Sequence, residues 1–152
     1  MAESALAPQP GVRYVGFWKR FVAFLIDSIV LMAIVVPLLA AVYGWSYFDA
    51  ARAGFAGVWD FLVQVVLPAV AAILFWHYKG ATPGKMAISA IIVDAQTGQP
   101  PSAKQSVVRY LAYFVSILPL FLDFAWIGFD PRKQGFHDKI AGTLVIYDKE
   151  KQ

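Results

Sequence analysis

Arg20 and Asp27 are the two charged side chains whose spacing has the clearest chemical meaning in this sequence. Both belong to the start of the first long apolar stretch. On a helix, seven steps of 100° leave them about 20° apart on one face and about 10 Å apart along the axis. An ionised carboxylate inside a membrane is costly unless it has a partner or takes up a proton. The pair therefore indicates either a buried clip that fixes helix packing or an ion-binding site of a transporter.

Asp123, His137 and Asp138 are the other candidate binding residues. Asp123 is a second acid within an apolar stretch, and its alternative role is that of an interfacial acid at the end of a span. The imidazole of His137 titrates near neutrality, so together with Asp138 it is suited to relay protons or to sense pH. The alternative is a hydrogen-bonded pair that anchors a loop.

Several kinds of chemistry are excluded by residue type and spacing. The segment around Gly84 and Lys85 has three residues between its glycines, and Met86 follows the lysine, whereas a phosphate-binding loop requires four residues and then Ser or Thr. His77 and His137 lie far apart without an organised set of carboxylates, and cysteine is absent. We therefore expect no catalytic residues, no metal site and no cofactor, and we do not expect an enzyme.

The composition indicates an integral membrane protein. Hydrophobic residues make up 59% of the 152 residues and charged residues only 15%. The 13 basic residues outnumber the 10 acidic ones, but they are dispersed around apolar segments. This distribution suits lipid headgroups and excludes a nucleic-acid partner.

Two apolar segments are predicted to cross the membrane. Residues 1–16 mix Ala, Pro and Gly without a period, and we expect a disordered or surface-lying lead. Residues 18–43 are the first predicted span, and residues 58–78 are the second. A signal peptide is the alternative for the first segment, but its length, its acid and the later apolar segments argue against that interpretation.

Two short strands are predicted outside these spans. Within the polar region 80–105, residues 85–94 have the pattern of a strand, and Ser102 is placed to cap the helix that follows. Residues 141–147 form the second predicted strand, which closes the chain. Because isolated strands are unstable, the two are expected to pair in one compartment, as a small cytoplasmic β element.

The third apolar segment, residues 107–129, leaves two topologies open. Its length is that of one span, which would place the two termini on opposite sides of the membrane. If it instead enters and returns as a helical hairpin broken near Pro119, every basic residue except Arg52 lies on one side. Charge distribution and strand pairing favour the re-entrant hairpin, with the N-terminus in the cytoplasm.

The ordered set of motifs in residues 16–148 resembles the RDD family of small membrane proteins. The set comprises Arg20 and Asp27 in the first span, Thr82-Pro-Gly84-Lys85, Arg109 at the third segment, and Gly135-Phe-His137-Asp138 with Gly142-Thr143 before the closing strand. The family is named for one arginine and two aspartates, which match Arg20, Asp27 and Asp138. The resemblance implies a bacterial membrane protein, with transport of ions or small ligands as the usual suggestion. It supplies no substrate.

These observations together predict a mainly α-helical multi-pass protein of the bacterial inner membrane. We expect a homo-oligomeric transporter or an ion- or proton-coupled exchanger, in which Arg20, Asp27 and Asp138 form one polar cluster near the cytoplasmic face. The alternative is a non-transporting scaffold or assembly factor that binds a membrane-protein partner. Gly84, Lys85, Arg109, Gly142 and Thr143 are expected to be structural motif residues.

Overall fold

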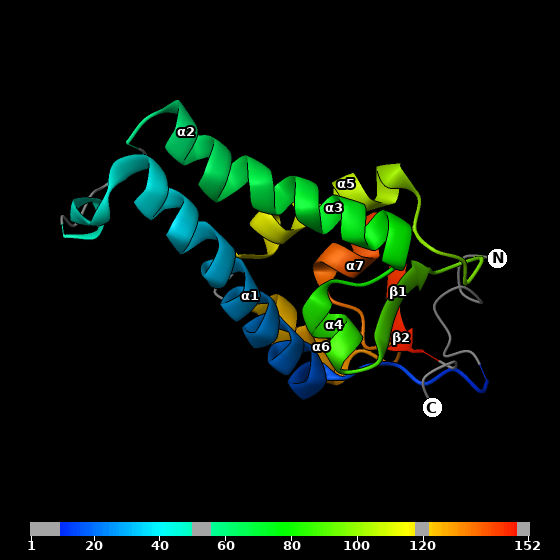
Figure 1. Ribbon diagram of the computed structural model, residues 1–152. Coiled ribbons are helices and arrows are strands. Elements are labelled where there is room, and N and C mark those ends of the chain that lie inside the picture. The colour runs from blue at the N-terminus through cyan, green and yellow to red at the C-terminus, as the bar shows by residue number, and fades with distance from the viewer. Residues whose placement is uncertain (1–9, 50–55, 118–121, 149–152) are drawn as a thin grey trace.

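The protein is a mostly helical molecule with one small sheet (Figure 1). The computed structural model describes residues 10–49, 56–117 and 122–148. The elements in chain order are α1 (Phe17–Tyr43), the 3-10 turn η1 (Trp45–Phe48), α2 (Val58–Phe61), the π turn η2 (Leu62–Val66), α3 (Leu67–Lys79), α4 (Pro83–Ala87), β1 (Ala90–Asp94), α5 (Ala103–Ile117), α6 (Leu122–Phe129), α7 (Phe136–Ala141) and β2 (Thr143–Tyr147).

Two long helices carry the candidate membrane spans. Helix α1 is one, and α2, η2 and α3 together form the other, Val58–Lys79. In their most apolar stretches only 11% and 6% of the residues are buried within the protein. A soluble core helix would be mostly buried, so these apolar surfaces are suited to contact with lipid. The two predicted spans are confirmed as helices that are long and apolar enough to cross a membrane.

The first turn of the second long helix contains a buried acid, Asp60. The hydroxyl of Tyr47 donates a hydrogen bond to Asp60 Oδ1 at 2.8 Å, and the backbone N–H of Ala56 donates to Oδ2 at 2.6 Å. The backbone N–H of Asp60 in turn donates to the hydroxyl of Tyr43 at 3.0 Å. These bonds join the end of α1 to the start of α2, at the end of the molecule opposite to the sheet (Figure 1).

The sheet confirms the predicted pairing of two strands. Strands β1 and β2 are antiparallel, with Ala90 opposite Tyr147 and Asp94 opposite Thr143. Residues just before α1 extend the pairing, because the N–H of Val15 donates to the carbonyl of Val145 at 3.0 Å. The side chain of Val15 is fully buried. The described part of the segment predicted as a disordered or surface-lying lead is therefore tied to β2.

The predicted strand over residues 85–94 is wrong in its first half. Residues Pro83–Ala87 form the short helix α4, and the strand begins only at Ala90. Between them Ser89 adopts a φ of 55°, which turns the chain. The local sequence is apolar enough for a strand, but contacts of α4 with α1 determine its conformation instead. The closing strand is also shorter than predicted, because Gly142 ends α7 with a φ of 66°.

The described residues of the third apolar segment belong to two helices, α5 and α6. Ser102 caps α5 as predicted: its backbone N–H donates to Gln105 Oε1 at 2.9 Å, and the N–H of Gln105 donates to Ser102 Oγ at 3.2 Å. Helix α5 packs against α7 and α3. The predicted break at Pro119 lies outside the described residues.

Candidate functional site

The carboxylate of Asp138 lies between two arginines. It belongs to the first turn of α7. Its Oδ2 accepts a hydrogen bond from Arg20 Nη1 at 2.5 Å, and its Oδ1 accepts one from Arg109 Nη1. All three side chains are buried, with 5% exposure for Arg20 and none for the other two. We call these three residues the Arg–Asp cluster.

The donors of Arg20 that do not contact Asp138 bind backbone carbonyls. Its Nε donates to the carbonyl of Val15 at 3.0 Å, and its Nη2 donates to the carbonyl of Lys133. The N–H of Gly135 donates to Asp138 Oδ2 at 3.1 Å. An acidic side chain is stabilised in the first turn of a helix because the backbone N–H groups point toward it there. Arg20 thus joins α1 to the segment before it and to the segment before α7.

Arg109 connects the same carboxylate to α5 and β2. Its Nη1 also donates to the hydroxyl of Thr143 at 2.6 Å. Its guanidinium lies 5.5 Å from the ring centre of Trp76 on α3, within cation–π distance. Arg109 and Thr143 were predicted as structural motif residues, and the sequence alone did not place them on Asp138. The signal available was a lone arginine in an apolar helix, which requires a buried anion.

The electrostatics of the cluster keep Asp138 ionised. Burial raises the pKa of the Asp138 carboxyl, but the positive charges of Arg109 and Arg20 outweigh burial, and the pKa lies well below its ordinary value. One carboxylate therefore neutralises part of the charge of two buried guanidinium groups. Such an arrangement is costly to form and strongly destabilised when one member is lost.

His137 is paired with Asp123, the acid of the third apolar segment. His137 Nδ1 lies 2.5 Å from Asp123 Oδ2, and the N–H of Phe136 donates to Asp123 Oδ1. His137 Nε2 lies 3.6 Å from Asp138 Oδ1, and its ring stacks on Tyr113 with ring centres 4.2 Å apart. Asp123 is fully buried, so it is not an acid exposed at the end of a span. Two carboxylates flank one imidazole here.

Asp27 does not join the Arg–Asp cluster, contrary to our prediction. The hydroxyl of Thr82 donates to Asp27 Oδ2 at 2.5 Å, and the N–H of Gly84 donates to Oδ1 at 2.7 Å. These bonds hold α4 against α1. The approach is so close that a Cβ on Gly84 would lie 2.0 Å from the carbonyl oxygen of Ala23. Glycine at this position is therefore a steric requirement.

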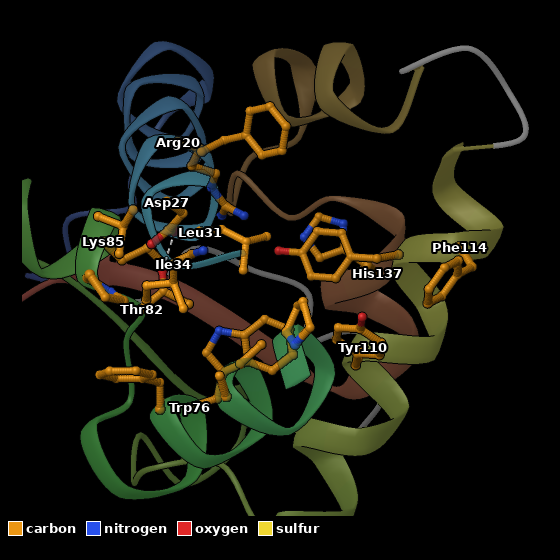
Figure 2. A pocket seen from close by; sticks show the side chains of 18 residues that line it. Arg20, Asp27, Leu31, Ile34, Trp76, Thr82, Lys85, Tyr110, Phe114 and His137 are labelled. Carbon is orange, nitrogen blue, oxygen red and sulfur yellow. Dashed lines mark hydrogen bonds between the residues drawn. The ribbon is translucent and has the colours of Figure 1, made fainter. Parts of the chain in front are cut away.

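A pocket of about 420 Å³ lies between α1, α3 and α5. Arg20 of the Arg–Asp cluster lines it, and so do the hydrogen-bonded Asp27 and Thr82. Arg20 and Ile34 both line it, so it extends for roughly 21 Å along α1. Figure 2 shows Asp27 beside Thr82 on one wall, with Tyr110 and Phe114 of α5 on the opposite wall. The lining residues are Arg20, Phe24, Asp27, Val30, Leu31, Ile34, Pro68, Ala71, Ala72, Phe75, Trp76, Thr82, Pro83, Lys85, Tyr110, Tyr113, Phe114 and His137.

The pocket is polar at one end and apolar along the rest of its length. Lys85 and His137 line the end near Arg20, close to α4 and α7, whereas Leu31 and Ile34 lie farther along α1. Asp27 lies between these two regions. Among the residues that the structure describes, no group of three His, Asp or Glu side chains is arranged so that it could hold a metal ion. The chemistry available in the pocket is that of isolated charges beside aromatic and aliphatic surface.

Comparisons with known proteins identify relatives of this chain. The model of the RDD family matches residues 14–142. The uncharacterised membrane protein YteJ of Bacillus subtilis is 28% identical over 90% of this chain and 82% of its own length. An uncharacterised protein of Rickettsia prowazekii is 44% identical over 46% of this chain. A proline-rich antigen homologue of Mycobacterium tuberculosis is 34% identical over 44% of it.

The matched regions differ in how much of each relative they cover. The match spans 38% of the Rickettsia protein and 28% of the mycobacterial one, so both relatives extend well beyond it. No solved structure matches this chain.

Proposed function

Because the chain belongs to the RDD family of membrane proteins, we propose that it is a transporter or ion-coupled exchanger of small ligands. The pocket between α1, α3 and α5 is its ligand site, and Asp27 is the acid that binds the coupling ion or proton. The Arg–Asp cluster holds the end of this pocket together. It is not the ion-binding group itself.

The observation that carries this proposal is the difference in the partners of the two aspartates. Asp138 is neutralised by two guanidinium groups, so it has little charge left to attract a cation. Asp27 accepts hydrogen bonds only from the neutral hydroxyl of Thr82 and the neutral N–H of Gly84, among the described residues. A carboxylate placed within a candidate span and without a counter-charge is typical of ion and proton pathways.

The pairing of the strands supports the topology that this function needs. Residues 13–15 and β1 are each hydrogen-bonded to β2, so we place all three segments on one side of the membrane. The segment 107–129 then enters and returns on that side, which we propose is the cytoplasm because every basic residue except Arg52 falls there. Labelling of single cysteines placed at Ser46 and Ser102 with an impermeant maleimide tests this: only Ser46 should react from outside.

The proposal also requires several copies of the chain. Two spans cannot enclose a pathway, so a transporter of this size works as an oligomer around an axis. Helices α5 and α6 offer apolar surface for such contacts, with Leu111, Phe114 and Trp126 exposed. A protein that is strictly monomeric in nanodiscs and still transports would contradict this part of the proposal.

The test measures flux of the coupling ion or proton across the membrane of proteoliposomes that contain the full chain. We expect Asp27→Asn to abolish ion-dependent flux, because asparagine keeps one acceptor for α4 but carries no charge. The matched control is Ser28→Ala on the same helix, whose hydroxyl donates to the carbonyl of Phe24 one turn earlier and whose loss should leave flux unchanged. Full flux in a folded Asp27→Asn protein would overturn the proposal.

A non-transporting scaffold is the second candidate, and the buried Arg–Asp cluster favours it. Charged side chains that join α1, α5, α7 and β2 fix a shape, as an assembly factor requires. In that case Asp27→Asn should leave recovery of a membrane-protein partner intact and no flux should be measurable in the wild type. Loss of flux in Asp27→Asn with partner recovery intact would exclude the scaffold.

A further inference from the structure

We infer that the pocket between α1, α3 and α5 binds a lipophilic organic monocation, whose positive centre pairs with Asp27 and whose apolar body fills the remaining volume. The inference deepens the proposed function, since it names a ligand class for the same pocket. It rests on the proposal that this pocket is the ligand site.

The size of the pocket selects an organic ligand over a metal ion. A volume of about 420 Å³ lies in the range of sites for small organic molecules, which is roughly 300–1,000 Å³. A hard metal ion needs several oxygen ligands to replace its water, and the described residues offer no group of three acidic or imidazole side chains that could hold a metal ion. One carboxylate beside apolar surface suffices for an organic cation, which is weakly hydrated.

The sign of the ligand's charge follows from which charged side chains of the pocket wall already contact an oppositely charged side chain. Arg20 contacts the carboxylate of Asp138, and His137 contacts that of Asp123. Asp27 has no such counter-charge among the described residues, and its two hydrogen bonds fix its position in the wall. It is therefore a fixed negative charge in the pocket wall that contacts only neutral donors.

Lys85 is a second charged side chain of the pocket wall without an ion-pair partner among the described residues. It differs from Asp27 because its long side chain can move. Its side chain is half-buried, and no carboxylate among the described residues forms an ion pair with it. A lysine has a long flexible stem and can withdraw its ammonium group into water at the membrane surface. An entering cation thus displaces Lys85, and Asp27 stays in place.

The aromatic surface of the pocket suits the same ligand class. Phe24, Phe75, Trp76, Tyr110 and Phe114 line it on three different helices. The faces of aromatic rings attract cations within about 6 Å and also bury apolar groups. An anion would meet the same ring faces unfavourably. Charge, size and surface chemistry therefore point to one class of ligand.

The first experiment compares two probes of the same shape and opposite charge. Tetraphenylphosphonium and tetraphenylborate are offered to the purified full chain in mild detergent, and binding is measured by equilibrium dialysis against protein-free micelles. We expect the cation to bind at least about tenfold more tightly than the anion. Equal affinity for the two probes, or tighter binding of the anion, would overturn the inference.

Two substitutions then test which side chains determine the preference of the pocket for a cation. Asp27→Asn should weaken binding of tetraphenylphosphonium about tenfold, whereas Lys85→Gln should strengthen it, because a like charge is removed. Weaker binding of the cation in Lys85→Gln, or unchanged binding in Asp27→Asn, would contradict the inference.

Further variants separate the charge of Asp27 from its structural contacts. Thr82→Val removes one hydrogen bond to Asp27 but keeps its charge, so it should weaken binding of the cation less than Asp27→Asn does. Ser28→Ala should bind normally. Thr82→Val would overturn the assignment of the cation to Asp27 if it weakened binding as much as Asp27→Asn does. The loss of binding would then come from displacement of α4 and not from the missing charge.

The dialysis and the flux experiment fail independently. Binding of tetraphenylphosphonium through Asp27 without any flux would contradict the transporter and leave the ligand class standing. Ion-dependent flux that needs Asp27, in a protein that does not bind tetraphenylphosphonium, would contradict the ligand class and leave the transporter standing.

Discussion

Asp138 and Asp27 are aspartates of the same protein with opposite surroundings. Asp138 is fully buried outside the two long helices and contacts two arginines. Asp27 is half-buried on α1, lines a pocket and accepts hydrogen bonds from neutral donors. The difference shows two uses of a carboxylate: a charge balanced by others fixes structure, whereas a charge left unbalanced beside a cavity is available to a ligand.

The largest effect is expected when the balance of the Arg–Asp cluster is broken. Asp138→Asn leaves the guanidinium groups of Arg20 and Arg109 buried without a counter-charge, which should destabilise the fold by about 3–5 kcal/mol. Asp27→Asn keeps one acceptor for its two neutral donors and should cost only about 1 kcal/mol. Denaturation of both variants in mild detergent measures the contrast. Equal losses of stability would show that the two aspartates do not differ in the way described.

A second test separates α4 from Asp27 without changing any charge. Gly84→Ala places a Cβ 2.0 Å from the carbonyl oxygen of Ala23, so α4 has to move away from α1, at a cost of about 1–3 kcal/mol. Ion-dependent flux should fall as well, because Asp27 loses the contacts that fix it.

The matched control for this test is another helical glycine. A Cβ on Gly128 in α6 would have no atom within 4 Å, so Gly128→Ala should be neutral or should stabilise by about 0.5–1 kcal/mol. If Gly84→Ala were as stable as Gly128→Ala, the close approach of α4 to α1 would be refuted.

The smallest expected effect is the response of the cluster to acid. The pKa of Asp138 is lowered from 3.8 in the folded protein, so its stabilising contribution is complete above pH 3.8 and is lost as the pH falls below that value. The loss from this group cannot exceed about 1.4 kcal/mol per pH unit. Unfolding measured between pH 7 and pH 3 should show this decline in the wild type. Asp138→Asn should show a smaller decline, and an identical slope would contradict the assignment.

Features governed by local sequence were predictable. The two long apolar helices follow from segment length and hydropathy, and the cap of α5 follows from Ser102 three residues before Gln105. The pairing of the two strands was also predictable, although they lie far apart in the sequence, because isolated strands are unstable. Their antiparallel direction was not predicted.

Features governed by contacts between distant residues were not predictable. The sequence around Met86 suits a strand, yet α4 forms because Asp27 accepts bonds from Thr82 and Gly84. The same helical periodicity that places Arg20 and Asp27 on one face suggested a common partner, whereas Arg20 contacts Asp138 and Asp27 contacts α4. Periodicity fixes the direction of a side chain but not which later segment meets it.

The link between Arg20 and Asp138 has a consequence for how the protein is made. The two residues are 118 positions apart, so a ribosome adding 5–20 residues per second needs roughly 6–24 s to deliver the acid after the arginine. During that interval every nascent chain presents an uncompensated guanidinium at the start of its first helix. An arrested or shortened chain that lacks Asp138 keeps the guanidinium of Arg20 without this counter-charge.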